Sequence, residues 1–186
     1  MEQKKIIITG GPSTGKTSLI HALERLGYPC FHEVIRSMTD AAKKDGSLTD
    51  MATNPIATVS DPMAFNTKIL NAREQHYIAA QKRPEPLIFF DRGMPDVIAY
   101  MDFFGQSYGN AFTKPMREHR YDRVFLLPIW EAIYVMDGER FEPIADAKAI
   151  HDHLYRTYTE FGYDVILVPK DSIANRTAFV LDTLHP

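Results

Sequence analysis

The chain has 186 residues, of which 45% are hydrophobic, and its formal net charge at pH 7 is −3. This size is typical of one compact domain, so we expect a single domain over residues 1–186. The mildly acidic balance argues against a general attraction to nucleic acid or anionic membranes. The single cysteine, Cys30, excludes an intrachain disulfide, and no apolar run approaches the ~20 residues of a membrane span. We therefore expect a cytoplasmic protein without a nucleic-acid partner.

Strand-like and helix-like segments alternate along the chain. The strand-like segments are continuous apolar runs, which are typical of a parallel sheet covered on both faces. They span residues 5–9, 29–33, 87–91, 123–127 and 164–168. The helix-like segments span residues 16–26, 34–44, 61–81, 95–104, 144–161 and 172–184, and residues 47–60 are expected to form a loop. This alternation predicts an α/β domain.

The segment GGPSTGKTS, residues 10–18, has the composition and spacing of a phosphate-binding loop. It fills the pattern GxxxxGK[ST] without a departure and lies between an apolar strand and a helix. Glycines let the backbone N–H groups converge on a polyphosphate, and the positive end of the following helix adds to the attraction. The residues predicted to bind a nucleotide are Gly10, Gly11, Pro12, Ser13, Thr14, Gly15, Lys16, Thr17 and Ser18.

Three side chains predict how a magnesium triphosphate is held. Lys16 is expected to reach the β- and γ-phosphates as a catalytic cation, and the Thr17 hydroxyl is expected to coordinate Mg²⁺. Asp91 ends the apolar run LIFFD, where phosphate-loop proteins place a carboxylate that holds the metal through water. ATP is the expected nucleotide. GTP is not excluded, although the sequence FLLPIW after the fourth strand lacks the guanine signature NKxD.

Transfer of a phosphoryl group also needs a carboxylate that orients or deprotonates the acceptor hydroxyl, and cations near the γ-phosphate. Glu33 follows the second strand and is therefore expected at the sheet edge that carries the phosphate loop. Its alternative role is to stabilise the start of the next helix. Arg36, one helical turn further on, is a candidate for substrate binding. Asp96 either binds an acceptor hydroxyl or starts a helix after Pro95.

A charged segment at about residues 128–150 precedes a long helix and contains the turn signal Asp137-Gly138. We predict that it forms a lid, which would exclude water from the phosphates. Arg140 is the basic residue best placed in this segment to close on them as a further catalytic cation. The alternative is a surface loop without a specialised role.

Four segments together resemble the NadR/Ttd-type AAA domain family, which includes a ribosylnicotinamide kinase domain and a trafficking protein that binds GTP and phosphatidic acid. They are GGPSTGKTSLI, HEVIR, FFDRGMPDVIAY and DGERFE, at residues 10–20, 32–36, 89–100 and 137–142. The resemblance implies a P-loop NTPase fold of the nucleoside and nucleotide kinase group, a three-layer αβα sandwich with strand order 2-3-1-4-5. It further implies that Glu33 is the general base and that Arg92 holds the acceptor near the transferring phosphate.

Three functions remain open from the sequence. The first is a small-molecule kinase that moves the γ-phosphate of Mg-ATP to a nucleoside-like hydroxyl. The second is a nucleotide-dependent switch, similar to an ATPase or GTPase, that acts on a protein or lipid partner. The third is a nucleic-acid-end kinase, which the acidic balance disfavours. The sequence predicts neither the acceptor's identity nor the oligomeric state.

Overall fold

A computed structural model describes residues 2–35, 61–133 and 143–184. Its centre is a sheet of five parallel strands in the order β2-β3-β1-β4-β5, as predicted. All pairs of neighbouring strands are parallel. The strands are β1 (Lys4–Gly10), β2 (Cys30–Phe31), β3 (Leu87–Asp91), β4 (Arg123–Leu127) and β5 (Val165–Leu167).

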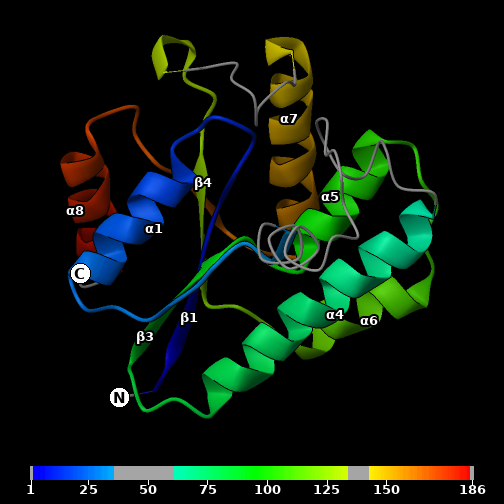
Figure 1. Ribbon diagram of the computed structural model, residues 1–186, viewed down its shortest axis with the longest axis horizontal. Helices are drawn as coiled ribbons and strands as arrows, with labels where there is room; N and C mark the ends of the chain where they lie inside the picture. Colours follow the sequence, from blue (N-terminus) through cyan, green and yellow to red (C-terminus); the bar gives the residue numbers. More distant parts are fainter. Residues whose placement is uncertain (1, 36–60, 134–142, 185–186) are drawn as a thin grey trace, which may run out of the picture.

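Helices cover both faces of this sheet, so the fold is a three-layer αβα sandwich (Figure 1). On one face lie α1 (Lys16–Arg25) and α8 (Ile173–Leu184). The other face carries α4 (Pro62–Gln81), α5 (Pro95–Phe103), α6 (Asn110–Glu118) and α7 (Ile144–Glu160). Residues Glu131–Ile133 form a short 3₁₀ helix.

The continuous apolar runs in the strands are explained by the two cores. In β1, Ile7 packs into the core beneath α4, α5, α6 and α7, whereas Ile6 and Ile8 pack into the core beneath α1 and α8. Successive side chains of a strand point to opposite faces, so a sheet that is buried on both faces needs apolar residues at every position. All three isoleucines are fully buried.

The pairing register brings the ends of three strands to one edge of the sheet. Ile8 in β1 lies beside Asp91 in β3, and Gly10 lies beside Leu127 at the end of β4. The loop that follows Gly10 is therefore next to Asp91. In β2, Phe31 pairs with Phe90, so Glu33 comes two residues beyond the last paired position at the same edge.

The helix predicted over residues 61–81 is confirmed as α4, and its first turn is capped. The Asp61 carboxylate accepts a hydrogen bond from the Ala64 N–H at 2.9 Å, and Pro62 is the first residue of α4. The carboxylate satisfies one of the free donors at the helix end, and the proline has no N–H that needs a partner there.

Helix α6 was not among the predicted elements, because Pro115 lies inside it. A proline removes one N–H of the helical ladder, and the carbonyl left without a donor belongs to Ala111. Ala111 is exposed, so water can bond to that carbonyl. Phe112 and Met116, one turn apart, are both buried and hold the helix against the core.

Several predictions fall wholly or partly outside the described residues. They concern Arg36, Arg140, most of the helix expected at 34–44, the loop at 47–60 and the centre of the lid. The last part of the lid segment, residues 144–150, belongs to α7, in which Ala147 and Ile150 are fully buried. A lid would thus have to lie before Ile144.

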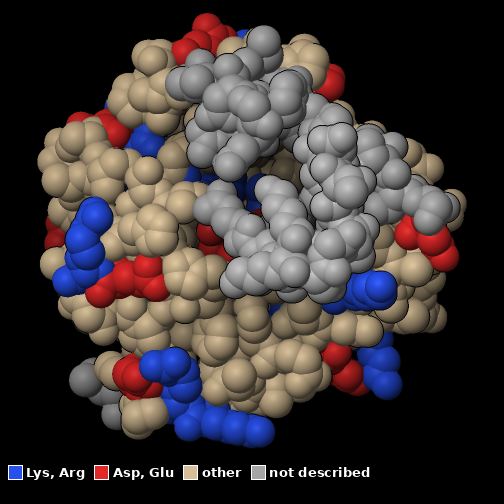
Figure 2. Space-filling view, in the orientation of Figure 1, with Lys and Arg blue, Asp and Glu red and all other residues tan. Residues whose placement is uncertain are grey.

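The described surface adds two observations. Figure 2 shows Lys, Arg, Asp and Glu side chains interspersed over the visible face, without a large region of one sign among the described residues. Within those residues, no helix is both long enough and apolar enough to cross a membrane.

Candidate functional site

The phosphate loop lies between the end of β1 and the start of α1, as the motif requires. Gly15 caps α1 with a φ of +87°, a left-handed conformation that side chains with a Cβ rarely adopt. Gly10 also has a positive φ, of +154°, and a Cβ there would lie only 2.8 Å from the Leu127 carbonyl oxygen. Both glycines of the motif are thus required by the backbone path.

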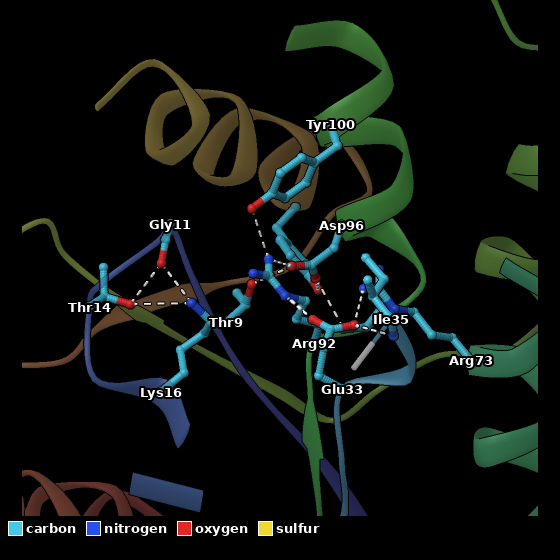
Figure 3. Close-up of polar contacts among 12 residues, drawn as sticks. Thr9, Gly11, Thr14, Lys16, Glu33, Ile35, Arg73, Arg92, Asp96 and Tyr100 are labelled. Atoms are coloured by element: carbon cyan, nitrogen blue, oxygen red, sulfur yellow. Dashed lines mark hydrogen bonds and ion pairs between the residues drawn. The ribbon is translucent and has the colours of Figure 1, made fainter. Parts of the chain in front are cut away.

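Lys16 turns back onto its own loop (Figure 3). Its ammonium donates to the Gly11 carbonyl oxygen at 2.6 Å and lies 3.4 Å from the Thr14 hydroxyl, which itself donates to the same carbonyl at 3.0 Å. Burial, together with the nearby charge of Arg92, lowers the pKa of Lys16 to about 7, although the charge of Asp91 opposes the shift. The charged ammonium is therefore poorly compensated, and a phosphate beside it would supply the missing countercharge.

Asp91 is the last residue of β3 and is nearly buried. Its Oδ1 atom is enclosed and has no hydrogen-bond partner in the part of the chain that the structure describes. Burial raises the pKa of Asp91 above its ordinary value, and the charge of Glu33 adds to the increase. A cation at Oδ1 would relieve both effects, so this carboxylate suits a metal ligand. Thr17, in the first turn of α1, is half-buried.

Glu33 lies between two arginines (Figure 3). Its Oε1 accepts a hydrogen bond from the Arg73 guanidinium at 3.0 Å, and its Oε2 contacts Nε of Arg92. Oε1 also lies 3.4 Å from the Ile35 N–H. Burial alone would raise the pKa of Glu33, but the charges of Arg73 and Arg92 outweigh it and hold the pKa below its ordinary value. Glu33 is thus ionised at neutral pH.

Arg73 was missed by the sequence analysis. It lies in α4 with a side chain that is only 4% exposed, and its second nitrogen donates to the Gly93 carbonyl oxygen at 3.0 Å. A signal was present, because Arg73 is four residues from both Ile69 and Tyr77, which are buried on the same helix face. A charged residue in a buried helical stripe needs a charged or polar partner.

Arg92 occupies a strained backbone position, with a φ of +74°. Its N–H donates to the Ile8 carbonyl oxygen at 3.0 Å, which ties this turn to the central strand. The guanidinium donates to the Tyr100 hydroxyl at 3.2 Å and lies 5.3 Å from the centre of that ring. These contacts fix the arginine at the end of β3, between Glu33 and Tyr100.

Asp96 is fully buried, and its contacts lie within the protein. Oδ1 accepts from the Thr9 hydroxyl at 2.5 Å and lies 3.5 Å from the Arg92 guanidinium. Oδ2 accepts from the Gly93 N–H at 3.0 Å and from the Tyr158 hydroxyl. This geometry favours the alternative that Asp96 organises the start of α5 over direct contact with a substrate.

The described structure therefore brings most of the predicted site residues to one sheet edge. The phosphate loop, Asp91 and Thr17 form one part of the site. We call the other part the arginine–carboxylate cluster, and its members are Glu33, Arg73, Arg92 and Asp96. The structure does not test Arg36 and Arg140, which lie outside the described residues.

A phosphate loop after the central strand of a 2-3-1-4-5 parallel sheet defines a P-loop fold of the nucleoside and nucleotide kinase type. The family described as AAA domain matches residues 5–176, and the chain belongs to this family. No curated protein sequence matches the chain.

Solved structures with the same fold include two of NadR. One, described in complex with NR, has a TM-score of 0.70 at 19% identity, and the other, in complex with NAD and AMP-PNP, has 0.72 at 18%. In each comparison 98% of this chain is covered, but it spans only 49% of the NadR chain.

Two kinases match over their whole length. Deoxyadenosine kinase from M. mycoides, with bound dATP, has a TM-score of 0.62 at 15% identity, and 98% of this chain is covered. Thymidylate kinase from Ehrlichia chaffeensis has a TM-score of 0.68 at 13% identity, with 99% of this chain covered. At such identities the likeness establishes the fold alone.

Proposed function

We propose that the protein is a kinase that transfers the γ-phosphoryl group of Mg-ATP to a hydroxyl of a nucleoside-like small molecule. The observation that carries this proposal is the position of Glu33. It is an ionised carboxylate held between two arginines, at the sheet edge that also carries the phosphate loop. A carboxylate in this position can align an acceptor hydroxyl beside the phosphates that the loop would hold.

In the proposed reaction the acceptor oxygen forms a bond to the γ-phosphorus, and the bond from that phosphorus to the β–γ bridging oxygen breaks. ADP leaves with the electron pair of the broken bond, and the acceptor hydroxyl loses its proton. Lys16 would neutralise charge on the β- and γ-phosphates, and Arg92 would hold the acceptor near the transferring group. Most of the rate enhancement in such a reaction comes from positioning and charge neutralisation.

The lowered pKa of Glu33 refines its role. A carboxylate paired with Arg73 and Arg92 is a weak base, so early removal of the acceptor proton is unfavourable. The same ionised carboxylate is a strong hydrogen-bond acceptor that aligns a hydroxyl well. We therefore infer that Glu33 mainly orients the acceptor and receives its proton late, as a loose transition state permits.

Magnesium fits the residues present. The unpartnered Oδ1 of Asp91, with its raised pKa, is suited to a nearby cation, and the Thr17 hydroxyl is the further candidate ligand. When bound, Mg²⁺ would neutralise negative charge on the phosphates.

The comparisons support the choice of donor and acceptor. One NadR structure holds AMP-PNP and deoxyadenosine kinase holds dATP, which favours ATP as the nucleotide. A second NadR structure holds NR, and this favours a nucleoside-like acceptor. This chain matches about half of NadR, so the activity of the whole NadR protein is not carried over. A cytoplasmic location and the absence of a nucleic-acid partner stay predictions.

The test is acceptor-dependent ADP release. Purified protein with Mg-ATP is assayed against a panel of nucleosides that includes nicotinamide riboside. We expect at least one compound to raise ADP release above the rate without acceptor. The Glu33→Gln variant should lose this rise while it still binds ATP, and the exposed carboxylate variant Glu118→Gln should keep it.

Other outcomes distinguish the alternatives. A flat panel, together with nucleotide-dependent binding of a protein or lipid, would favour the switch. A rise that survives Glu33→Gln would show that the cluster does not receive the acceptor.

A further inference from the structure

Arg176 is a buried arginine outside the arginine–carboxylate cluster, and it contacts the phosphate loop although it lies near the other end of the chain. Arg176 lies in α8, its side chain is 1% exposed, and its guanidinium donates to the Thr14 carbonyl oxygen at 2.9 Å. Figure 1 shows α8 beside α1, the helix that begins at the loop. Arg176 contacts the backbone of the loop, whereas Lys16 belongs to the loop itself.

The guanidinium is also held from a third segment. Its central carbon lies 4.9 Å from the ring centre of Trp130, which follows β4. Stacking on an indole stabilises an arginine and limits its rotation. A Cβ at Gly15 would lie 3.0 Å from the same guanidinium, so this position needs glycine for the arginine's approach as well as for its backbone angle. The contact is therefore close and well fixed.

Arg176 forms no salt bridge with the described residues, and Asp171 is the described carboxylate whose charge acts on it from a distance. Its Nε and second terminal nitrogen are buried without a hydrogen-bond partner, and none of the described carboxylates forms a salt bridge with it. The Asp171 carboxylate, on the preceding turn, accepts from the Ser172 N–H at 2.6 Å and from the Asn175 amide at 2.9 Å, and it acts on Arg176 only through its charge. A buried cation without a countercharge is costly unless another group supplies the charge.

We propose that Arg176 is a positioning residue of the nucleotide site, which fixes and polarises the Thr14–Gly15 peptide of the loop toward a bound polyphosphate. A hydrogen bond from a cation to a peptide carbonyl makes the N–H of the same peptide a stronger donor, and this N–H belongs to Gly15. The phosphates in turn add negative charge near Arg176, which has no salt bridge among the described residues. The inference rests on the proposed function only as far as the loop binds a triphosphate.

The test measures binding of Mg-ATP and of inorganic tripolyphosphate by titration calorimetry. Arg176→Met should weaken both about tenfold, which corresponds to about 1.4 kcal/mol. Arg176→Lys should lose less, because it keeps the charge but not the planar guanidinium. Thr177→Val removes a neighbouring side-chain hydrogen bond within the same helix and should bind both ligands as the wild type does. Thermal unfolding without ligand is recorded for each variant.

Several results would overturn the inference. A folded Arg176→Met protein that binds tripolyphosphate like the wild type would reduce Arg176 to a structural residue, even if its unfolding temperature fell. Weaker binding of ATP alone would place its action at the base instead of the phosphates. If Arg176→Met does not fold, the uncharged Arg176→Gln variant, whose amide can still donate to the Thr14 carbonyl oxygen, takes its place, and unchanged tripolyphosphate affinity in that variant has the same meaning. A wild-type protein that binds neither ligand would overturn the proposed function, and this inference with it.

Discussion

The phosphate loop and the arginine–carboxylate cluster lie at the same sheet edge, but they differ in how their cationic side chains are paired. Beside the loop, Lys16 and Arg176 donate to backbone carbonyl oxygens, and neither has a salt bridge within the described residues. In the cluster, the arginines face carboxylates, with Glu33 bridging Arg73 and Arg92.

This difference separates the two tasks of the site. Beside the loop, carboxylates act on the positive charges only from a distance and form no salt bridge with them among the described residues, so this part of the site suits an anion that comes from outside. The cluster contains two carboxylates and two guanidinium groups, so it is close to neutral and suits an uncharged acceptor. We expect substitutions in the loop to affect ligand binding first and substitutions in the cluster to affect the fold as well.

Lys16→Ala should have the largest effect. It removes the cation predicted to meet the β- and γ-phosphates, and turnover should fall by about 10²- to 10³-fold. The free energy of unfolding should not fall, because burial already disfavours the charged lysine. ATP titration, turnover and urea denaturation measure these effects. The exposed Lys68→Ala variant is the control, and unchanged ATP affinity in Lys16→Ala would contradict the assignment of the loop.

Asp96→Asn should destabilise the protein, because it removes a carboxylate from the arginine–carboxylate cluster. An amide NH₂ in place of Oδ1 would face the Arg92 guanidinium, and in place of Oδ2 it would face the Gly93 N–H. Neither of these donors can become an acceptor. We expect a loss of about 3 kcal/mol in the free energy of unfolding, measured by urea denaturation.

Asp102→Asn, on the same helix but only half-buried, is the control for that substitution. It should change stability little, because among the described residues its carboxylate makes a single long hydrogen-bond contact, of 3.4 Å, with the Tyr108 hydroxyl. An Asp96→Asn protein as stable as the control would show that the buried carboxylate does not organise this turn.

Arg73→Met should have a smaller effect, and one that depends on pH. Arg73 and Arg92 are the principal causes of the lowered pKa of Glu33. Among the described residues, its charge also interacts with Lys16, Asp91, His76 and Tyr100. Without Arg73, burial raises this pKa, so activity that needs ionised Glu33 should be lost at a higher pH as the solution is acidified. We expect kcat/KM at neutral pH to fall about tenfold through loss of a charge-assisted hydrogen bond.

The measurement for Arg73→Met is the pH dependence of kcat/KM, with the exposed Arg156→Met variant as the control. A reduced rate with no shift of the acidic limb would mean that Arg73 supports the fold but does not hold Glu33 in its ionised form.

Local patterns were enough to predict the phosphate loop, because its function depends on contiguous residues and on backbone angles that glycine permits. The position of Asp91 beside the loop was predictable for the same reason, since it directly ends an apolar strand. The order of the strands came from the family resemblance. These features do not depend on how distant helices pack.

The arginine–carboxylate cluster could not be predicted from local sequence patterns. Arg73 and Glu33 are 40 positions apart in the sequence, and their contact depends on the orientation of α4 against the sheet. The sequence leaves open whether Asp96 binds an acceptor or starts a helix, since its partner Tyr158, in α7, is 62 positions away and no local pattern indicates the contact. Proline disfavours a helix interior, so Pro115 argues against a helix at this point in the sequence. In the structure, the burial of Phe112 and Met116 outweighs that local preference, and α6 forms.

The hydrogen bond from Arg176 to Thr14 also bears on how the protein folds. Its two residues are 162 positions apart, so the chain entropy lost in forming this contact is among the largest that the domain can require. During synthesis, α1 and the central strand leave the ribosome long before α8 does. A nascent chain thus contains the whole GGPSTGKTS sequence without the arginine that holds it. We expect ATP to stabilise the domain against proteolysis only after α8 has docked.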